Sequence, residues 1–153
     1  MYVTLAGSSQ ISVIDTVALQ EHDVVPDDPD EMSSLGTQGI ALPPGANPFD
    51  LTLDPDGKLL FVSDYTSANI YVIDVDPFSS RFHEVIQILS FETGGEQLAP
   101  LGLRGLAVSA DGERLYVTAP KRDLFRSGAG GPGLILTADI LTLDERRLSL
   151  IHI

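Results

Sequence analysis

The chain contains no cysteine and only three histidines among its 153 residues. Without cysteine it cannot form disulfides, zinc–thiolate sites or iron–sulfur clusters, and it has no thiol nucleophile. Basic residues are also few, because nine Lys and Arg stand against 22 Asp and Glu, for a formal net charge of −13. Such a charge repels phosphate backbones, so we expect no nucleic-acid partner.

Long apolar runs are absent as well. No stretch approaches the roughly 18 residues that a membrane-spanning helix needs, and the N-terminus has no signal-peptide pattern. We therefore expect no membrane span in this chain. Hydrophobic residues make up 43% and charged residues 20% of the sequence, values typical of a globular domain rather than a disordered segment.

An internal repeat is the strongest signal in the sequence. Residues 49 to 64 recur at residues 104 to 119, and residues 2 to 16 match residues 61 to 75. The first pair of segments shares identical residues at five positions: Leu51/Leu106, Asp56/Asp111, Gly57/Gly112, Leu60/Leu115 and Val62/Val117. Three copies of one unit are therefore present.

Each copy has the pattern of short antiparallel strands. Val, Ile, Leu, Thr and Tyr alternate with a period of two and are separated by Asp-Gly or Ser/Asn turns, whereas no stretch has a helical period. In the middle copy we expect strands near residues 49–53, 59–64, 69–75 and 84–90. Asp54-Pro-Asp-Gly57 resembles a calcium motif, but its repeat Ser109-Ala-Asp-Gly112 indicates a hairpin turn. A repeated unit of four strands is how a β-propeller blade is built.

Several segments resemble the YVTN-type β-propeller repeat: Tyr2-Val-Thr, Ile11-Ser-Val-Ile-Asp-Thr, Asn47-Pro-Phe-Asp-Leu-Thr-Leu-Asp-Pro-Asp-Gly and Leu115-Tyr-Val-Thr. The resemblance covers most of residues 1 to 119 and departs at Asp64 and Ala119, where the repeat usually has Asn. It implies a propeller of the kind found in bacterial and archaeal surface and periplasmic proteins, and in lactonase-like and redox-enzyme domains. A periplasmic, secreted or cell-surface location follows from the resemblance.

The sequence thus predicts an all-β fold, a β-propeller fragment of about three four-stranded antiparallel blades in an open arc rather than a closed ring. We place the blades at about residues 1–45, 46–101 and 102–147, with the first and last incomplete. Because Met1 opens directly onto the second strand of a blade, we expect that an earlier part of the first blade is missing.

The last six residues, 148 to 153, need a separate interpretation. Their sequence, Leu-Ser-Leu-Ile-His-Ile, is what the bases CTGTCTCTTATACACATC encode, and that string resembles a transposase adapter used in sequencing libraries. We interpret the tail as a translated adapter and exclude it from the fold. The alternative is a natural apolar strand.

Residues 17 to 38 have the pattern of an insertion between the third and fourth strands of the first blade. It carries six acidic residues: Glu21, Asp23, Asp27, Asp28, Asp30 and Glu31. Calcium favours several carboxylate oxygens, but the spacing fits no EF-hand, and Pro26 and Pro29 indicate an extended segment. We favour a solvated acidic loop. The weaker alternative is a metal site formed by Asp27, Asp28, Asp30 and Glu31.

Two further insertions, residues 91–104 and 120–133, should emerge from adjacent blades on one face, beside the central channel. They carry four of the nine basic residues: Arg104, Lys121, Arg122 and Arg126. Such a cluster suits a small anionic ligand, because Arg forms bidentate contacts with carboxylate or phosphate. The alternative, which we weight more heavily, is a Gly-rich loop whose charges only keep it solvated, since no strand-to-helix context marks a phosphate loop.

Residues that indicate catalysis are scarce. His22, His83 and His152 have no ligand spacing, and no serine has a nucleophile-elbow pattern, so we expect no catalytic residue, no cofactor and no metal. The leading hypothesis is a non-catalytic propeller scaffold that binds a protein, a polysaccharide or a small anion on its loops. The alternative is a fragment of a lactonase-like hydrolase or redox-enzyme propeller whose active residues lie in other blades.

Overall fold

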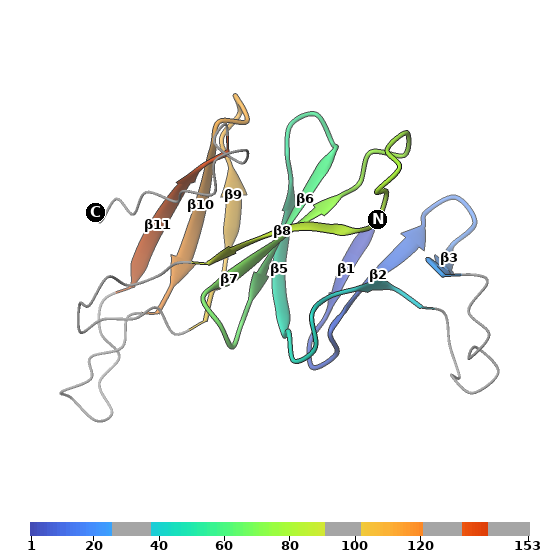
Figure 1. Cartoon of the computed structure of the whole chain (residues 1–153), viewed down its shortest axis with the longest axis horizontal. Coiled ribbons are helices and arrows are strands. Elements are labelled where there is room, and N and C mark those ends of the chain that lie inside the picture. Colours follow the sequence, from blue (N-terminus) through green and yellow to red (C-terminus); the bar gives the residue numbers. More distant parts are fainter. Residues whose placement is uncertain (26–37, 91–101, 121–132, 141–153) are drawn as a thin grey trace.

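The computed structural model describes residues 1–25, 38–90, 102–120 and 133–140. These residues form three antiparallel sheets that stand side by side in sequence order, and none of the sheets closes on itself (Figure 1). The expected all-β class and open arrangement are therefore confirmed. In this part of the chain no helix is long and apolar enough to cross a membrane. The residue bounds given to the blades stay predictions, and the 148–153 tail lies outside the described residues.

The middle sheet, sheet 2, is an uninterrupted four-stranded meander. Its strands are β5 (Pro48–Leu53), β6 (Leu59–Asp64), β7 (Asn69–Asp74) and β8 (Val85–Ser90). The expected strands agree with these within one residue. The carboxylate of Asp54 accepts the backbone N–H groups of Lys58 (2.7 Å) and Leu59 (2.9 Å), and Gly57 has a φ of 68°. The Asp-Gly segment is thus a hairpin turn, as its repeat indicated.

Sheet 1 corrects one expectation. Its strands are β1 (Tyr2–Leu5), β2 (Gln10–Asp15), β3 (Gln20–His22) and β4 (Ile40–Ala41). The sequence placed all of residues 17 to 38 in an insertion, which is wrong for β3, because β3 pairs with β2 in the register Val13↔His22. The strand β4 then pairs with the same β2, so the insertion interrupts the outer strand instead of preceding it. Asp27, Asp28, Asp30 and Glu31 lie outside the described residues.

Sheet 3 contains β9 (Leu106–Val108), β10 (Arg114–Ala119) and β11 (Leu134–Asp139). The order is β11-β10-β9, which repeats the first three strands of sheet 2. At its hairpin, Ser109 replaces Asp54, and the Ser109 hydroxyl accepts the N–H of Arg114 (2.9 Å). A serine oxygen and an aspartate oxygen therefore close equivalent turns.

The core is two apolar layers, one on each side of sheet 2. Successive residues of β6 point to opposite faces, as strand geometry requires. Leu60 and Val62 pack against Ile11 and Ile40 of sheet 1, whereas Phe61 packs against the apolar side chains of sheet 3. These five named side chains are fully buried. Each such side chain stabilises the fold by about 1.5–3 kcal/mol, so sheet 2 depends on both neighbours.

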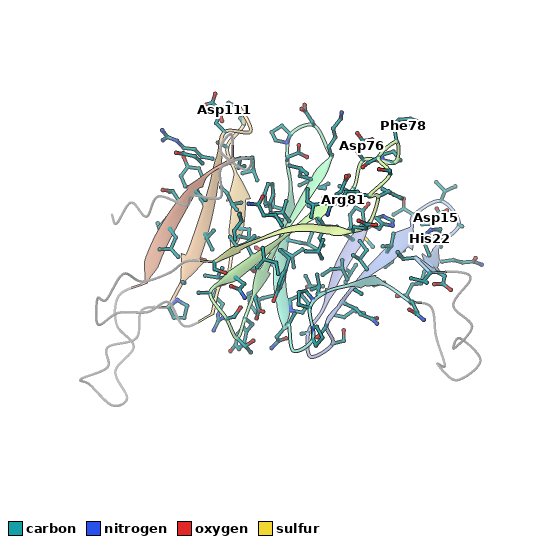
Figure 2. All side chains as sticks on the ribbon, in the orientation of Figure 1. Asp15, His22, Asp76, Phe78, Arg81 and Asp111 are labelled. Atoms are coloured by element: carbon teal, nitrogen blue, oxygen red, sulfur yellow. The ribbon has the colours of Figure 1, made fainter. Side chains whose placement is uncertain are left out.

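The connections that the structure describes in full lie on two opposite faces of the three sheets (Figure 1). The turns at residues 16–19, 54–58, 75–84 and 109–113 lie on one face, which we name the turn face; Asp76, Phe78 and Asp111 mark it in Figure 2. The β1–β2, β4–β5 and β6–β7 connections lie on the other, which we name the loop face. Each sheet contributes one strand to a common edge: β1 contacts β5, and β5 contacts β9. We call this the shared edge of the sheets.

At the loop face, backbone hydrogen bonds join sheets 2 and 3. The N–H of Leu103 donates to the carbonyl of Asp64 (2.6 Å), and the preceding Gly102 has a φ of 64°. A Cβ atom at Gly102 would overlap the carbonyl oxygen of Tyr65. Only glycine therefore fits where the chain enters sheet 3.

We expect Gly102→Ala to destabilise the fold more than the same change at Gly45. Both residues have a positive φ, which costs a non-glycine residue about 1–2 kcal/mol, but a Cβ at Gly45 meets no atom within 4 Å. Urea unfolding followed by circular dichroism should show an additional loss of at least about 1 kcal/mol for Gly102→Ala, comparable with other overpacking changes. Equal losses of unfolding free energy in the two variants would mean that the backbone around Gly102 can shift to accept a Cβ atom.

Candidate functional site

Arg104 lies at the loop face, between the end of sheet 2 and the start of β9. Its N–H donates to the carbonyl of Thr118 (2.8 Å), and its own carbonyl accepts the Ser63 hydroxyl (2.7 Å). Ser63 belongs to β6 and Thr118 to β10, so one strand from each of two sheets fixes the backbone of Arg104. Of the four basic residues in the predicted anion site, this is the one that the structure describes.

The guanidinium of Arg104 is held on an aromatic surface. Its Cζ atom lies 3.6 Å from the ring centroid of Tyr65 and 5.4 Å from that of Phe49. The two rings are themselves 5.4 Å apart and tilted by 34°. Nη1 donates to the carbonyl oxygens of Tyr65 (3.3 Å) and Leu103 (3.2 Å). Stacking on an aromatic ring and two carbonyl contacts fix the plane of the guanidinium.

The charge of Arg104 has no acidic partner among the described residues. The ion pairs there join Lys58 to Asp76, Arg81 to Glu84 and Arg114 to Asp139. The nearby carboxylate of Asp50 accepts the backbone N–H groups of Leu51 and Leu106 (both 2.9 Å). Nη1 is thus used by carbonyls, while Nε and Nη2 have no hydrogen bond to any described residue. These N–H groups are the part of the site that can receive an anion.

A buried carboxylate supports the loop that presents Tyr65. Asp64 Oδ1 accepts the N–H (2.8 Å) and the hydroxyl (2.9 Å) of Thr66 and the N–H of Ser67 (3.2 Å), and Oδ2 accepts the Tyr71 hydroxyl (2.6 Å). Asp64 stands where the YVTN repeat usually has Asn, and its oxygens cap the loop.

Burial raises the pKa of Asp64, but the hydrogen bonds from Tyr71 and Thr66 outweigh burial, so the pKa lies below its ordinary value. Burial, and after it the hydrogen bond to Asp64, raises the pKa of Tyr71 to about 12. Neither group changes its charge near neutral pH, so the pair has a structural role rather than a role in proton transfer.

Three of the four basic residues of the predicted anion site lie outside the described residues: Lys121, Arg122 and Arg126. Their approach to Arg104 stays a prediction. Sequence reasoning also missed Tyr65 and Phe49. The available signal was an aromatic residue at two strand ends of the middle copy: Phe49 begins the expected strand 49–53, and Tyr65 directly follows the expected strand 59–64.

His83, in the turn between β7 and β8, contacts Tyr2 of sheet 1. His83 Nε2 hydrogen-bonds the Tyr2 hydroxyl (3.2 Å), and the His83 ring stacks on Phe82 at 3.7 Å. Burial lowers the pKa of His83, and the charge of His22 lowers it further. Within the described ranges no three His, Asp or Glu side chains form a group that could hold a metal ion.

Comparison with solved structures identifies the fold. The hydrazine synthase of Kuenenia stuttgartiensis superposes with a TM-score of 0.62 and 18% identity, over 91% of this chain and 35% of the other. The periplasmic gluconolactonase of Pseudomonas aeruginosa gives 0.61 and 19%, over 98% and 36%. A putative 6-phosphogluconolactonase of Bacteroides uniformis gives 0.53 and 20%, over 99% and 36%.

These likenesses define the class of fold, a β-propeller, and at such identities they show the fold alone. The chain spans about a third of each of these structures, which agrees with an arc of blades rather than a whole ring. No family model matches the sequence, and no curated protein matches it significantly.

We expect Tyr71→Phe to reduce stability by about 1.5–3 kcal/mol, because it leaves the buried Asp64 carboxylate without a charge-assisted hydrogen bond. It should also reduce the depression of the Asp64 pKa. Tyr116→Phe is the matched control, since that tyrosine is partly exposed and its hydroxyl has no hydrogen bond to any described residue. Thermal unfolding of both variants tests this, and equal melting temperatures would contradict a structural role for the pair.

Acid should destabilise the junction of sheets 1 and 2. Because the pKa of His83 in the folded state lies below its ordinary 6.5, the unfolded chain binds the proton more readily. The stability from neutral His83 is complete above about pH 6.5 and is lost as the pH falls through the lowered pKa. His83→Asn should flatten the fall in melting temperature between pH 7.5 and 5, whereas His22→Asn should retain most of it. A slope unchanged in His83→Asn would assign the effect to other groups.

Proposed function

We propose that this chain supplies part of the ligand face of a lactonase-like β-propeller of the YVTN repeat type, and that Arg104 binds the anionic group of the ligand. The observation that carries the proposal is the fixed guanidinium, stacked on Tyr65 and without an acidic partner among the described residues. The chain has a net charge of −13, so a positive charge without an acidic partner among the described residues contrasts with the rest of the molecule.

The position of Arg104 supports a ligand role. Phe49 belongs to β5, and Arg104 lies two residues before the start of β9. These two strands lie next to each other on the shared edge of the sheets. In a propeller this edge faces the central channel, where ligands bind. The rings of Phe49 and Tyr65 are both partly exposed, so they offer an apolar wall beside the cation.

The ligand chemistry follows from the guanidinium and from the structural neighbours. A planar guanidinium forms paired hydrogen bonds with carboxylate or phosphate oxygens. Gluconolactonase acts on a sugar lactone, and hydrolysis of a lactone produces a carboxylate. We therefore propose a sugar-derived acid or its lactone as the ligand class. Lys121, Arg122 and Arg126 would add positive charge from the following loop, because β10 ends at Ala119, next to the Thr118–Arg104 hydrogen bond.

Binding of gluconate to the chain, measured by calorimetry, tests the role of Arg104. Arg104→Ala should weaken binding about tenfold or more, because a charge-assisted hydrogen bond contributes about 1.5–3 kcal/mol. Arg104→Lys should restore only part of the affinity, since a point charge lacks the paired geometry. Arg81→Ala removes the same charge from the turn face and should leave binding unchanged. Equal effects of Arg104→Ala and Arg81→Ala would reject the site.

A second assay distinguishes a lactonase-like enzyme from a non-catalytic scaffold. It measures hydrolysis of glucono-1,5-lactone by the full-length gene product that contains this chain. Turnover that falls in the Arg104→Ala variant supports the lactonase-like function. Gluconate binding without turnover would reject that function and favour a non-catalytic binding scaffold with the same anion site.

A further inference from the structure

Phe49 and Arg104 occupy the same place in two successive repeats. The internal repeat pairs Phe49 with Arg104, and it pairs Thr4 with Ser63. The backbone contacts follow this pairing. The Ser63 hydroxyl donates to the Arg104 carbonyl (2.7 Å), and the Thr4 hydroxyl donates to the Phe49 carbonyl (3.1 Å). In each case a hydroxyl of the preceding sheet holds the residue at the point where the chain enters its own sheet.

A β-bulge lies at this place in both sheets. The register of β5 against β6 shifts at Phe49 and Asp50, which together lie opposite one residue of β6. In sheet 3, Thr118 accepts the N–H of Arg104 (2.8 Å) and donates its own N–H to the carbonyl of Gly105 (2.9 Å), so two residues again lie opposite one. Bulges re-aim side chains and are common beside active sites. The same backbone feature thus presents Phe49 in one sheet and Arg104 in the next.

The two side chains meet at Tyr65, between sheets 2 and 3. The Cζ atom of Arg104 lies 3.6 Å from the ring centroid of Tyr65, which is a stacking distance, but 5.4 Å from the ring centroid of Phe49. The guanidinium therefore covers Tyr65 more closely than Phe49. The Phe49 side chain is 47% exposed. The cation thus stands beside an aromatic ring that it does not itself cover.

This arrangement suits a ligand that has C–H groups next to its acid group. An anion that binds the guanidinium of Arg104 is held near the Phe49 ring, because the guanidinium carbon is 5.4 Å from the ring centroid. The face of an aromatic ring carries partial negative charge and attracts C–H groups, and burial of apolar surface stabilises the contact further. Inorganic phosphate has no carbon to place against the ring, whereas gluconate has C–H groups directly beside its carboxylate.

Building on the function proposed above, on which this inference rests, we propose that Phe49 is a specificity-determining residue of the same site. Phe49 contacts the carbon skeleton of the bound sugar-derived acid or lactone, while Arg104 binds its oxygen atoms. Arg104 alone attracts carboxylate and phosphate alike, because a guanidinium forms paired hydrogen bonds with either group. Phe49 adds affinity only for a ligand with a carbon framework, so the pair distinguishes an organic acid from an inorganic anion.

Calorimetry on the full-length gene product that contains this chain, with gluconate and inorganic phosphate as probes, tests the role of Phe49. Phe49→Ala should weaken gluconate binding about fivefold, as the loss of a small apolar contact does, and should leave phosphate binding unchanged. Phe49→Tyr keeps the ring and should retain the gluconate affinity. Phe78→Ala is the matched control: Phe78 is 96% exposed on the turn face (Figure 2), and its loss should change neither affinity.

The phosphate measurement separates specificity from positioning. Equal weakening of gluconate and phosphate binding in Phe49→Ala would mean that Phe49 only positions Arg104, and an unchanged gluconate affinity would mean that the ring does not contact the ligand. Either result overturns the role of Phe49 and leaves the Arg104 site in place. Gluconate binding that is absent, or that Arg104→Ala does not weaken, would instead reject the proposed function and this role with it. Thermal unfolding checks that the variants are folded, and Phe49→Gln, which also removes the ring, replaces Phe49→Ala if the latter does not fold.

Discussion

Face-to-face packing of sheets is the interaction on which the rest of this structure depends. A strand alternates its side chains between two faces, and in the first four residues of β6 (Leu59 to Val62) both sets are apolar. Neither face of sheet 2 can therefore meet water without a large loss of stability. The sheets therefore cover one another in sequence order, and the connections are displaced to the two ends of the strands. The separation of a turn face from a loop face is a consequence of that packing.

The candidate site arises where one repeat passes into the next. Ser63 and Asp50 of sheet 2 bind the backbone around Arg104 and Leu106 of sheet 3. The same hydrogen bonds that align two sheets therefore also fix the base of the arginine, while Tyr65 fixes its tip. A ligand group held by this arginine would be positioned by the junction itself, and not by a single loop.

Much of the fold could be predicted because the middle repeat combines a strict alternation with Asp-Gly turns, whose chemistry is local. The strand β3 could not, because the turn before it has no glycine: the Asp15 carboxylate binds the N–H groups of Val17 and Ala18, and Leu19 adopts a φ of 54°. Arg104 was predictable from the scarcity of basic residues. Its stacking on Tyr65 was not, because that contact joins residues 39 positions apart through a particular loop geometry.

The interrupted outer strand of sheet 1 makes this fold a natural host for added sequence. Its two parts, β3 and β4, are joined at the break by a hydrogen bond from Val24 N–H to the Gln38 carbonyl (2.9 Å), and the Asp23 carboxylate accepts the Gln38 N–H (3.3 Å). With the ends of the break clamped, the entropy of closing the intervening segment rises only with the logarithm of its length. Evolution or a protein engineer can therefore change the length and composition of that segment, to display an epitope or a reporter, while the ladder on either side remains in register.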